Sequence, residues 1–180
     1  MKKLLLICLL SAAFSFGAFA QQGSIHLNVG AEGAFPMGDW SEGYNIGFGA
    51  SAKGLYGVSD AGQAGLNLGW NRFGMKDDID EDFSASISIV PVFAVYRHYF
   101  GGLYVEPQAG LSIVKSKITV SGTDMGSFSG SGSSTSFGYA AGLGYLMGDI
   151  DISARYQGFS ESGMNGGFAA LRIAYHFSLN

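Results

Sequence analysis

Alternation of apolar and small polar residues is the feature that most constrains this sequence. Near the start of the chain, Ile25, Leu27 and Val29 alternate with His26 and Asn28. Successive side chains of a β-strand point to opposite faces, so a period of two predicts strands with one apolar and one polar face. The pattern recurs in eight segments, near residues 24–35, 44–56, 63–71, 83–96, 103–113, 136–145, 150–157 and 169–177. No segment shows helical spacing, and the sequence therefore predicts an all-β fold.

The first 20 residues are typical of an export signal. Two lysines precede an apolar run from Leu4 to Phe19, which ends in a small-x-small cleavage pattern at Ala20. We therefore expect residues 1–20 to be a cleavable signal peptide and residues 21–180 to form a single β-barrel domain. The one cysteine, Cys8, lies in the leader. We expect no disulfide, thiol catalyst or zinc-thiolate site in the mature protein.

A soluble eight-stranded ligand carrier would show the same alternation with its polar face outward. Here the polar face consists mostly of Gly, Ser, Asn and Gln, whereas a face exposed to water usually carries many Lys and Glu. Aromatic residues of the apolar face gather at the strand ends, as lipid interfaces favour. They are Phe35, Tyr44, Trp70, Phe83, Phe137, Tyr139 and Tyr156 at one end, and Tyr56, Tyr99, Tyr145, Tyr175 and Phe177 at the other. These features predict an eight-stranded antiparallel up-and-down transmembrane β-barrel.

The predicted connections alternate in length. Long ones lie near residues 36–43, 74–82, 116–134 and 158–166, and short ones near residues 57–62, 100–102 and 147–149. Bacterial outer-membrane barrels have short periplasmic turns and long external loops. We therefore expect the cell outer membrane as the location, with both chain termini on the periplasmic side. The formal net charge of −4 gives no basic footprint for nucleic acid, and we expect none to bind.

Charged residues on the predicted inward face form a balanced set of three acids and three bases. They are Glu32, Lys53, Glu106, Asp151, Arg155 and Arg172. Buried charges must be paired, so this set is interpreted as a structural network that fills the barrel, with a gate or ion path as the alternative. The same parity places Pro91, Pro107 and Arg97 on the lipid-facing side, where Arg97 would have to reach the headgroups.

Three histidines, His26, His98 and His176, fall on the predicted inward face near the periplasmic ends of their strands. The first and last strands of a closed barrel are neighbours, so His26 and His176 are expected to approach each other. No carboxylate has metal-ligand spacing to either residue, and interior hydrogen bonding is the favoured interpretation over a metal or pH-sensitive site.

Two predicted external loops are candidates for surface contacts. An acidic loop holds a possible divalent-cation site at Asp77, Asp78, Asp80, Glu81 and Asp82. Phe83 stands where a calcium loop needs glycine, so a solvated loop is favoured over a bridge through divalent cations to lipopolysaccharide. Residues 121–134 are almost entirely Gly, Ser and Thr, and they are interpreted as a flexible loop with an adhesive or spacer role.

Three stretches carry a resemblance to a known family. Residues 96–111 read YRHYFGGLYVEPQAGL, residues 141–145 read AGLGY, and residues 171–177 read LRIAYHF. They resemble the small outer-membrane β-barrel domain family, which is related in architecture to the OmpA and OmpX barrels. In this family the closing strand, which here ends on the aromatic Phe177, is an insertion signal. The resemblance therefore implies that the barrel-assembly machinery inserts the protein. It also implies outer-membrane lipids and lipopolysaccharide as surroundings.

Three functions remain open from the sequence. The favoured one is a structural barrel without cofactor or metal, whose loops contact an external partner that the sequence does not identify. A narrow porin-like channel is the first alternative, because glycines line the polar face of three strands. A lipid A-modifying enzyme is the second, because His176-Phe177-Ser178 resembles the His-x-Ser of lipid A deacylases. No later strand supplies an orienting acid, and we expect no enzymatic activity.

Overall fold

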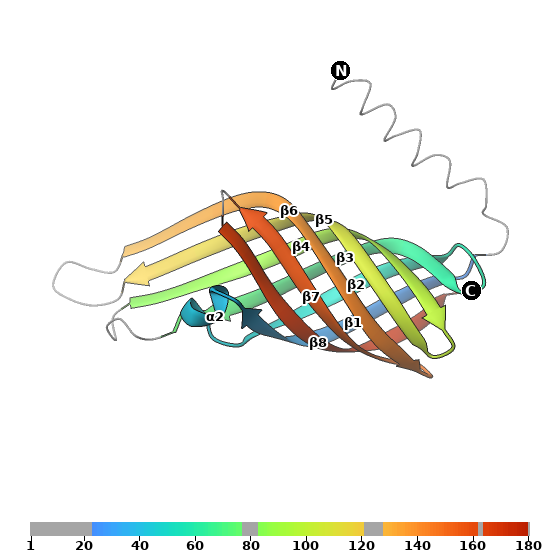
Figure 1. The fold of residues 1–180 in the computed structure, drawn as a ribbon. Helices are drawn as coiled ribbons and strands as arrows, with labels where there is room; N and C mark the ends of the chain where they lie inside the picture. The colour runs from blue at the N-terminus through green and yellow to red at the C-terminus, as the bar shows by residue number, and fades with distance from the viewer. Residues whose placement is uncertain (1–22, 77–82, 121–127, 162–163, 180) are drawn as a thin grey trace, which may run out of the picture.

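Our structure, a computed structural model, describes residues 23–76, 83–120, 128–161 and 164–179. Within these ranges, eight antiparallel strands pair in chain order and close into a barrel (Figure 1), which confirms the predicted fold. The strands are β1 Ile25–Met37, β2 Gly47–Gly57, β3 Gly62–Gly74, β4 Phe83–Phe100, β5 Leu103–Val120, β6 Phe128–Met147, β7 Ile150–Glu161 and β8 Met164–Leu179. Pairing of Ile25 with Leu179 joins β1 to β8 and completes the barrel.

The one helix in the described ranges is α2, a single turn over Trp40–Gly43 that the sequence pattern did not predict. It follows β1 after Gly38, whose φ of 61° is the left-handed conformation that favours glycine. No helix in the described part of the chain is long and apolar enough to span a membrane.

The two ends of the barrel differ in their connections. Three short turns and the ends of β1 and β8 share one end, which we call the turn end. Two of these turns reverse the chain at Gly101 and Gly148, whose φ angles are 70° and 61°. The opposite end, which we call the loop end, carries α2 and the longer connections.

Two of the predicted long loops are wrong in extent. β5 and β6 continue to Val120 and Phe128, within the region predicted as loop, and β7 and β8 occupy much of residues 158–166. The Ser- and Gly-rich composition suggested mobility, but adjacent backbones pair in register, as Lys117 does with Ser131. Figure 1 shows β4, β5 and β6 projecting beyond the other strands. We call residues 83–88, 115–120 and 128–133 the extension.

Side-chain parity follows the prediction on every strand except β4. Just before β2, Tyr44 was predicted outward and instead packs against the buried apolar cluster at the loop end. Apolar residues such as Leu66 and Ile173 are outward and 65% exposed, as a lipid-facing surface requires. In β4, however, Phe93 and Arg97 face the interior and are fully buried, and Tyr96 faces outward. The prediction failed there because residues 90–96 are apolar on both faces of the strand. The inward face was therefore inferred from the alternating Ser84, Ser86 and Ser88 alone.

The two strand prolines each interrupt one ladder. Pro91 pairs with Ser112 of β5, and the β3–β4 pairing skips its position. Pro107 pairs with Ala141 of β6, and the β4–β5 pairing skips its position. The register continues unchanged past both gaps, so neither proline needs a bulge. The parity prediction is correct for Pro107, which is outward, and wrong for Pro91, which is inward and buried.

Candidate functional site

Inward side chains of all eight strands fill the barrel, and their chemistry changes along its axis. Charged and amide side chains occupy the turn-end half, and aromatic and aliphatic side chains occupy the loop end. We call Lys53, Arg97, Glu106 and Asp151 the turn-end charge cluster. We call Glu32, Arg155 and Arg172 the mid-barrel cluster.

The turn-end charge cluster is joined by ion pairs between strands that are distant in sequence. Arg97 lies between two carboxylates: its Nη2 is 2.6 Å from Glu106 Oε2, and its Nη1 is 2.9 Å from Asp151 Oδ2. Lys53 forms an ion pair with the other carboxylate oxygen of Glu106. All four side chains are buried, so the pairs are shielded from water and from salt.

Neutral side chains complete the hydrogen bonding of the two carboxylates. Tyr104 donates its hydroxyl to Asp151 Oδ1 at 2.5 Å, and Asn28 donates Nδ2 to Asp151 Oδ2 at 2.8 Å. Gln108 donates Nε2 to Glu106 Oε1 at 2.8 Å. The guanidinium carbon of Arg97 lies 3.8 Å from the centre of the Tyr104 ring, which adds a cation–π contact.

The mid-barrel cluster lies nearer the loop end. Arg155 Nη2 donates to Glu32 Oε1 at 2.8 Å. Arg172 donates Nε to the Ser51 hydroxyl at 2.7 Å and Nη2 to the carbonyl oxygens of Asn28 and Ser51, each at 3.3 Å. The six charged residues singled out from the sequence thus all lie inside the barrel, divided between two clusters.

Arg97 corrects the predicted set. The sequence parity placed it toward lipid, whereas it occupies the centre of the turn-end charge cluster. The described interior therefore holds four bases against three acids, and the predicted balance of three and three is wrong. A signal was present, because an inward arginine avoids the cost of placing a charge against lipid.

Two of the three histidines meet, as predicted. The rings of His26 and His176 stack with centroids 4.8 Å apart. Nε2 of His176 lies 3.1 Å from Nδ1 of His26. His26 also lies 3.2 Å from the Ser178 hydroxyl. His98 was predicted inward, but β4 turns it outward, beside Tyr96. No carboxylate hydrogen-bonds to these histidines among the described residues, and no group of three His, Cys, Asp or Glu there suits a metal ion.

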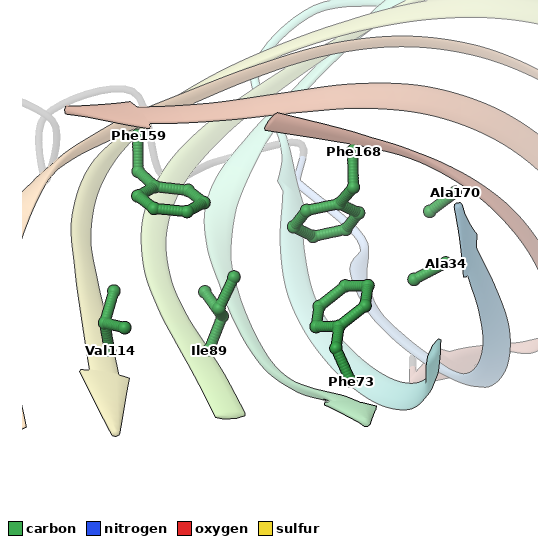
Figure 2. Packing of buried hydrophobic residues seen from close by; sticks show 7 residues of the cluster. All are labelled: Ala34, Phe73, Ile89, Val114, Phe159, Phe168 and Ala170. Atoms are coloured by element: carbon green, nitrogen blue, oxygen red, sulfur yellow. The ribbon is translucent and has the colours of Figure 1, made fainter. Parts of the chain in front are cut away.

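An apolar plug at the loop end was missed by the sequence reasoning. Figure 2 shows Phe159 and Phe168 pointing toward Phe73 and Ile89 from the opposite wall. Trp40 of α2 packs on this group, with ring centroids 5.4 Å from Phe73 and 5.0 Å from Phe159. We call these residues, with Tyr44, Val114, Ala34 and Ala170, the aromatic cap. The signal was present in the sequence. On the inward faces of β3, β7 and β8, the polar residues give way toward the loop end to the apolar residues Phe73, Phe159 and Phe168.

A basic groove lies on the outward side of the extension. Arg72, Lys115 and Lys117 line it together with serines of β4 and β6, and all three basic side chains are exposed. Arg72 Nη2 lies 3.4 Å from the Ser86 hydroxyl. The predicted acidic cation site at residues 77–82 and the predicted signal peptide both lie outside the described residues.

Comparison with known proteins agrees with this architecture. Residues 6–177 match the family model described as "Outer membrane protein beta-barrel domain". No curated protein matches the sequence.

Several solved structures share the fold. Ail, the attachment invasion locus protein of Yersinia pestis, has 19% sequence identity and a TM-score of 0.60, covering 87% of this chain and 100% of Ail. Neisserial surface protein A has 13% identity and a TM-score of 0.57, covering 88% of this chain and 100% of that chain. The N-terminal barrel of Pseudomonas aeruginosa OprF has 18% identity and a TM-score of 0.55, covering 87% and 100%. A further Ail structure contains the heparin analogue sucrose octasulfate.

Proposed function

This chain belongs to the outer membrane protein β-barrel domain family, and on that basis we propose that it is a closed, non-enzymatic barrel that supports the envelope and presents a basic surface to anionic groups outside the cell. The observation that carries the proposal is that side chains fill the barrel interior at both ends. The turn-end charge cluster fills one half of the barrel, and the aromatic cap fills the other.

The closure argues against the porin-like alternative. Glycines that line the polar face do not leave open space, because neighbouring side chains occupy it. A Cβ on Gly138, for example, would lie 2.8 Å from Cζ of Phe93. Ions would have to cross both the buried ion pairs and the aromatic cap, and an eight-stranded barrel offers little space between its side chains.

Planar-bilayer recording tests this closure. We expect the wild-type protein to give no stable unitary conductance, and the double variant F73A/F159A to give intermittent currents because it removes two rings of the aromatic cap. Phe137→Ala is the matched control, since Phe137 faces outward and is 61% exposed. Stable wild-type conductance that disappears in Arg155→Ala or Arg172→Ala would establish a channel instead.

The basic groove supports the second half of the proposal. Arg72 lies two residues from the outward aromatic Trp70 along β3, so the groove begins where the lipid-facing surface ends. We propose that Arg72, Lys115 and Lys117 bind phosphate groups of lipopolysaccharide. The structure of Ail in complex with the heparin analogue sucrose octasulfate supports anion binding by a barrel of this fold. Assembly by the barrel-assembly machinery and cation bridging at residues 77–82 remain predictions.

Binding to lipopolysaccharide vesicles tests the groove. Each basic residue near an anionic surface contributes about 1 kcal/mol, so the triple variant R72Q/K115Q/K117Q should lose on the order of 100-fold in affinity. Lys76→Gln is the control, because Lys76 is exposed but donates to the carbonyl of Ser41 and does not line the groove. Equal losses in both variants would contradict a defined site.

The lipid A-modifying alternative has little support. His26 and Ser178 are in contact, but among the described residues no carboxylate hydrogen-bonds to His26 or His176 to orient a catalytic base. We expect lipid A mass spectra to stay unchanged when the gene is deleted or overexpressed. A mass shift that depends on His176 would identify an enzyme.

A further inference from the structure

The charges inside the barrel do not sum to zero. Four buried bases face three buried acids in the described interior. The turn-end charge cluster is neutral, because its two bases pair with its two carboxylates. The excess positive charge therefore belongs to the mid-barrel cluster, where the single carboxylate of Glu32 faces two arginines.

Arg172 is the one buried base that forms no ion pair among the described residues. Glu32 is its cross-strand neighbour on β1, but the carboxylate of Glu32 pairs with Arg155. Arg172 is 2% exposed, and its hydrogen bonds go to the hydroxyl and carbonyl oxygen of Ser51 and to the carbonyl oxygen of Asn28, which are neutral. Its third nitrogen, Nη1, is buried and has no partner among the described residues. A buried charge that lacks a counter-charge is strongly unfavourable, whereas a paired one is tolerated.

Among the described residues, the unpartnered buried atoms near Arg172 are mostly donors, with one carboxylate oxygen, Glu32 Oε2, beside them. Arg155 uses Nη2 for Glu32, but its Nε and Nη1 are buried and find no acceptor in the described part of the chain. Arg155 lies opposite Ala170, so the two arginines come from neighbouring strands, two positions apart on the same inward face. Gln157, at the next inward position of β7, has both Nε2 and Oε1 buried without a partner among the residues that the structure describes.

We infer that the barrel binds one small monovalent anion, with the charge and size of chloride, between Arg155 and Arg172. The excess is a single charge, so a monovalent ion neutralises the mid-barrel cluster. A water molecule would satisfy the free N–H donors and leave the charge in place. Both arginines are buried, so the ion must be small. This ion site is independent of the proposed surface function.

Equilibrium dialysis of the folded protein against radioactive chloride, in a gluconate buffer of constant ionic strength, tests the inference. We expect the wild-type protein to retain about one chloride per barrel, because one charge is unpaired. Bromide should compete, and it should give an anomalous diffraction peak beside Arg172. Failure of the wild-type protein to retain halide overturns the inference without any variant.

Two variants of the mid-barrel cluster and one control variant locate the site. Arg172→Gln removes the unpaired charge and should weaken chloride binding at least about tenfold. Lys76→Gln is the control: it removes a positive charge from an exposed side chain that does not line the basic groove, and it should leave the dissociation constant unchanged. Glu32→Gln raises the interior positive charge and should tighten binding. Equal weakening in Arg172→Gln and Lys76→Gln would assign the chloride to the protein surface and overturn the interior site.

Discussion

The two halves of the barrel interior are both filled, but with opposite chemistry. The turn-end half is a network of ion pairs in which Arg97 joins Glu106 to Asp151. The loop-end half is an apolar core like that of a soluble protein, enclosed by strands and covered by Trp40. Ion pairs depend on every partner being present, whereas packed rings lose stability in proportion to the volume removed. The two halves should therefore respond differently to substitution.

The largest expected effect is in the turn-end half. Arg97→Met keeps much of the side-chain volume but leaves two buried carboxylates without their shared cation. We expect the free energy of unfolding in lipid vesicles to fall by about 4 kcal/mol, measured by urea titration. Arg72→Met, at an exposed arginine, should change it by less than about 0.5 kcal/mol. Similar losses in both variants would show that the turn-end charge cluster contributes no special stability.

The matching change in the loop-end half is Phe73→Ala. It opens a cavity between Trp40 and Phe168, and we expect a loss of about 3 kcal/mol in the same titration. Near-ultraviolet circular dichroism should also change, because Trp40 loses a ring contact. Phe137→Ala, on the outward face, provides the control and should leave that spectrum unchanged. A Phe73→Ala loss no larger than that of the control would contradict a packed cap.

A smaller effect separates hydrogen bonding from charge in the turn-end half. Tyr104→Phe keeps the ring under Arg97 but removes the hydroxyl that donates to Asp151. Because the acceptor is a charged group, we expect a loss of about 2 kcal/mol. Tyr139→Phe, at an outward tyrosine, should change the free energy of unfolding by less than about 0.5 kcal/mol. If Tyr104→Phe lowers the free energy of unfolding as much as Arg97→Met does, the Tyr104 hydroxyl contributes more to the stability of this half than the ion pairs do.

The smallest expected effect concerns the cover of the loop-end half. Lys76 donates to the carbonyl of Ser41 and holds α2 over the cap. Lys76→Gln should cost about 0.5 kcal/mol globally, typical of a surface contact. Hydrogen exchange at the Tyr44 amide, which donates to Trp40, should become faster, while exchange in the strands stays the same. Uniformly faster exchange would mean that α2 is part of the barrel's cooperative unit.

The overall fold was predictable because its signal is local. Each strand shows its own period of two, and the difference between aliphatic residues on one face and Gly, Ser and Asn on the other identifies the lipid side. β4 failed because both of its faces are apolar between residues 90 and 96, so local alternation carried no information there. The charge of Arg97 was the better guide to the inward face of β4.

Only the membership of the candidate site was predictable, and without Arg97. Parity placed Lys53 and Glu106 inside the barrel, but their pairing depends on how β2 and β5 are staggered around it, which neither strand encodes alone. The cap was missed for a related reason. Phe159 lies in a stretch whose glycines and serines indicated a loop, and only its approach to Phe73 and Ile89 across the lumen reveals a core.

The extension sets how far from the lipid the protein can act. From Phe137, an outward aromatic at the end of the lipid-facing surface, β6 continues back to Phe128. These nine further residues span roughly 30 Å along the strand. Pairing with β5 keeps this stretch extended, so it is a rigid strand rather than a flexible linker. A partner met at its tip need not approach the bilayer, and short surface sugars would not hide it.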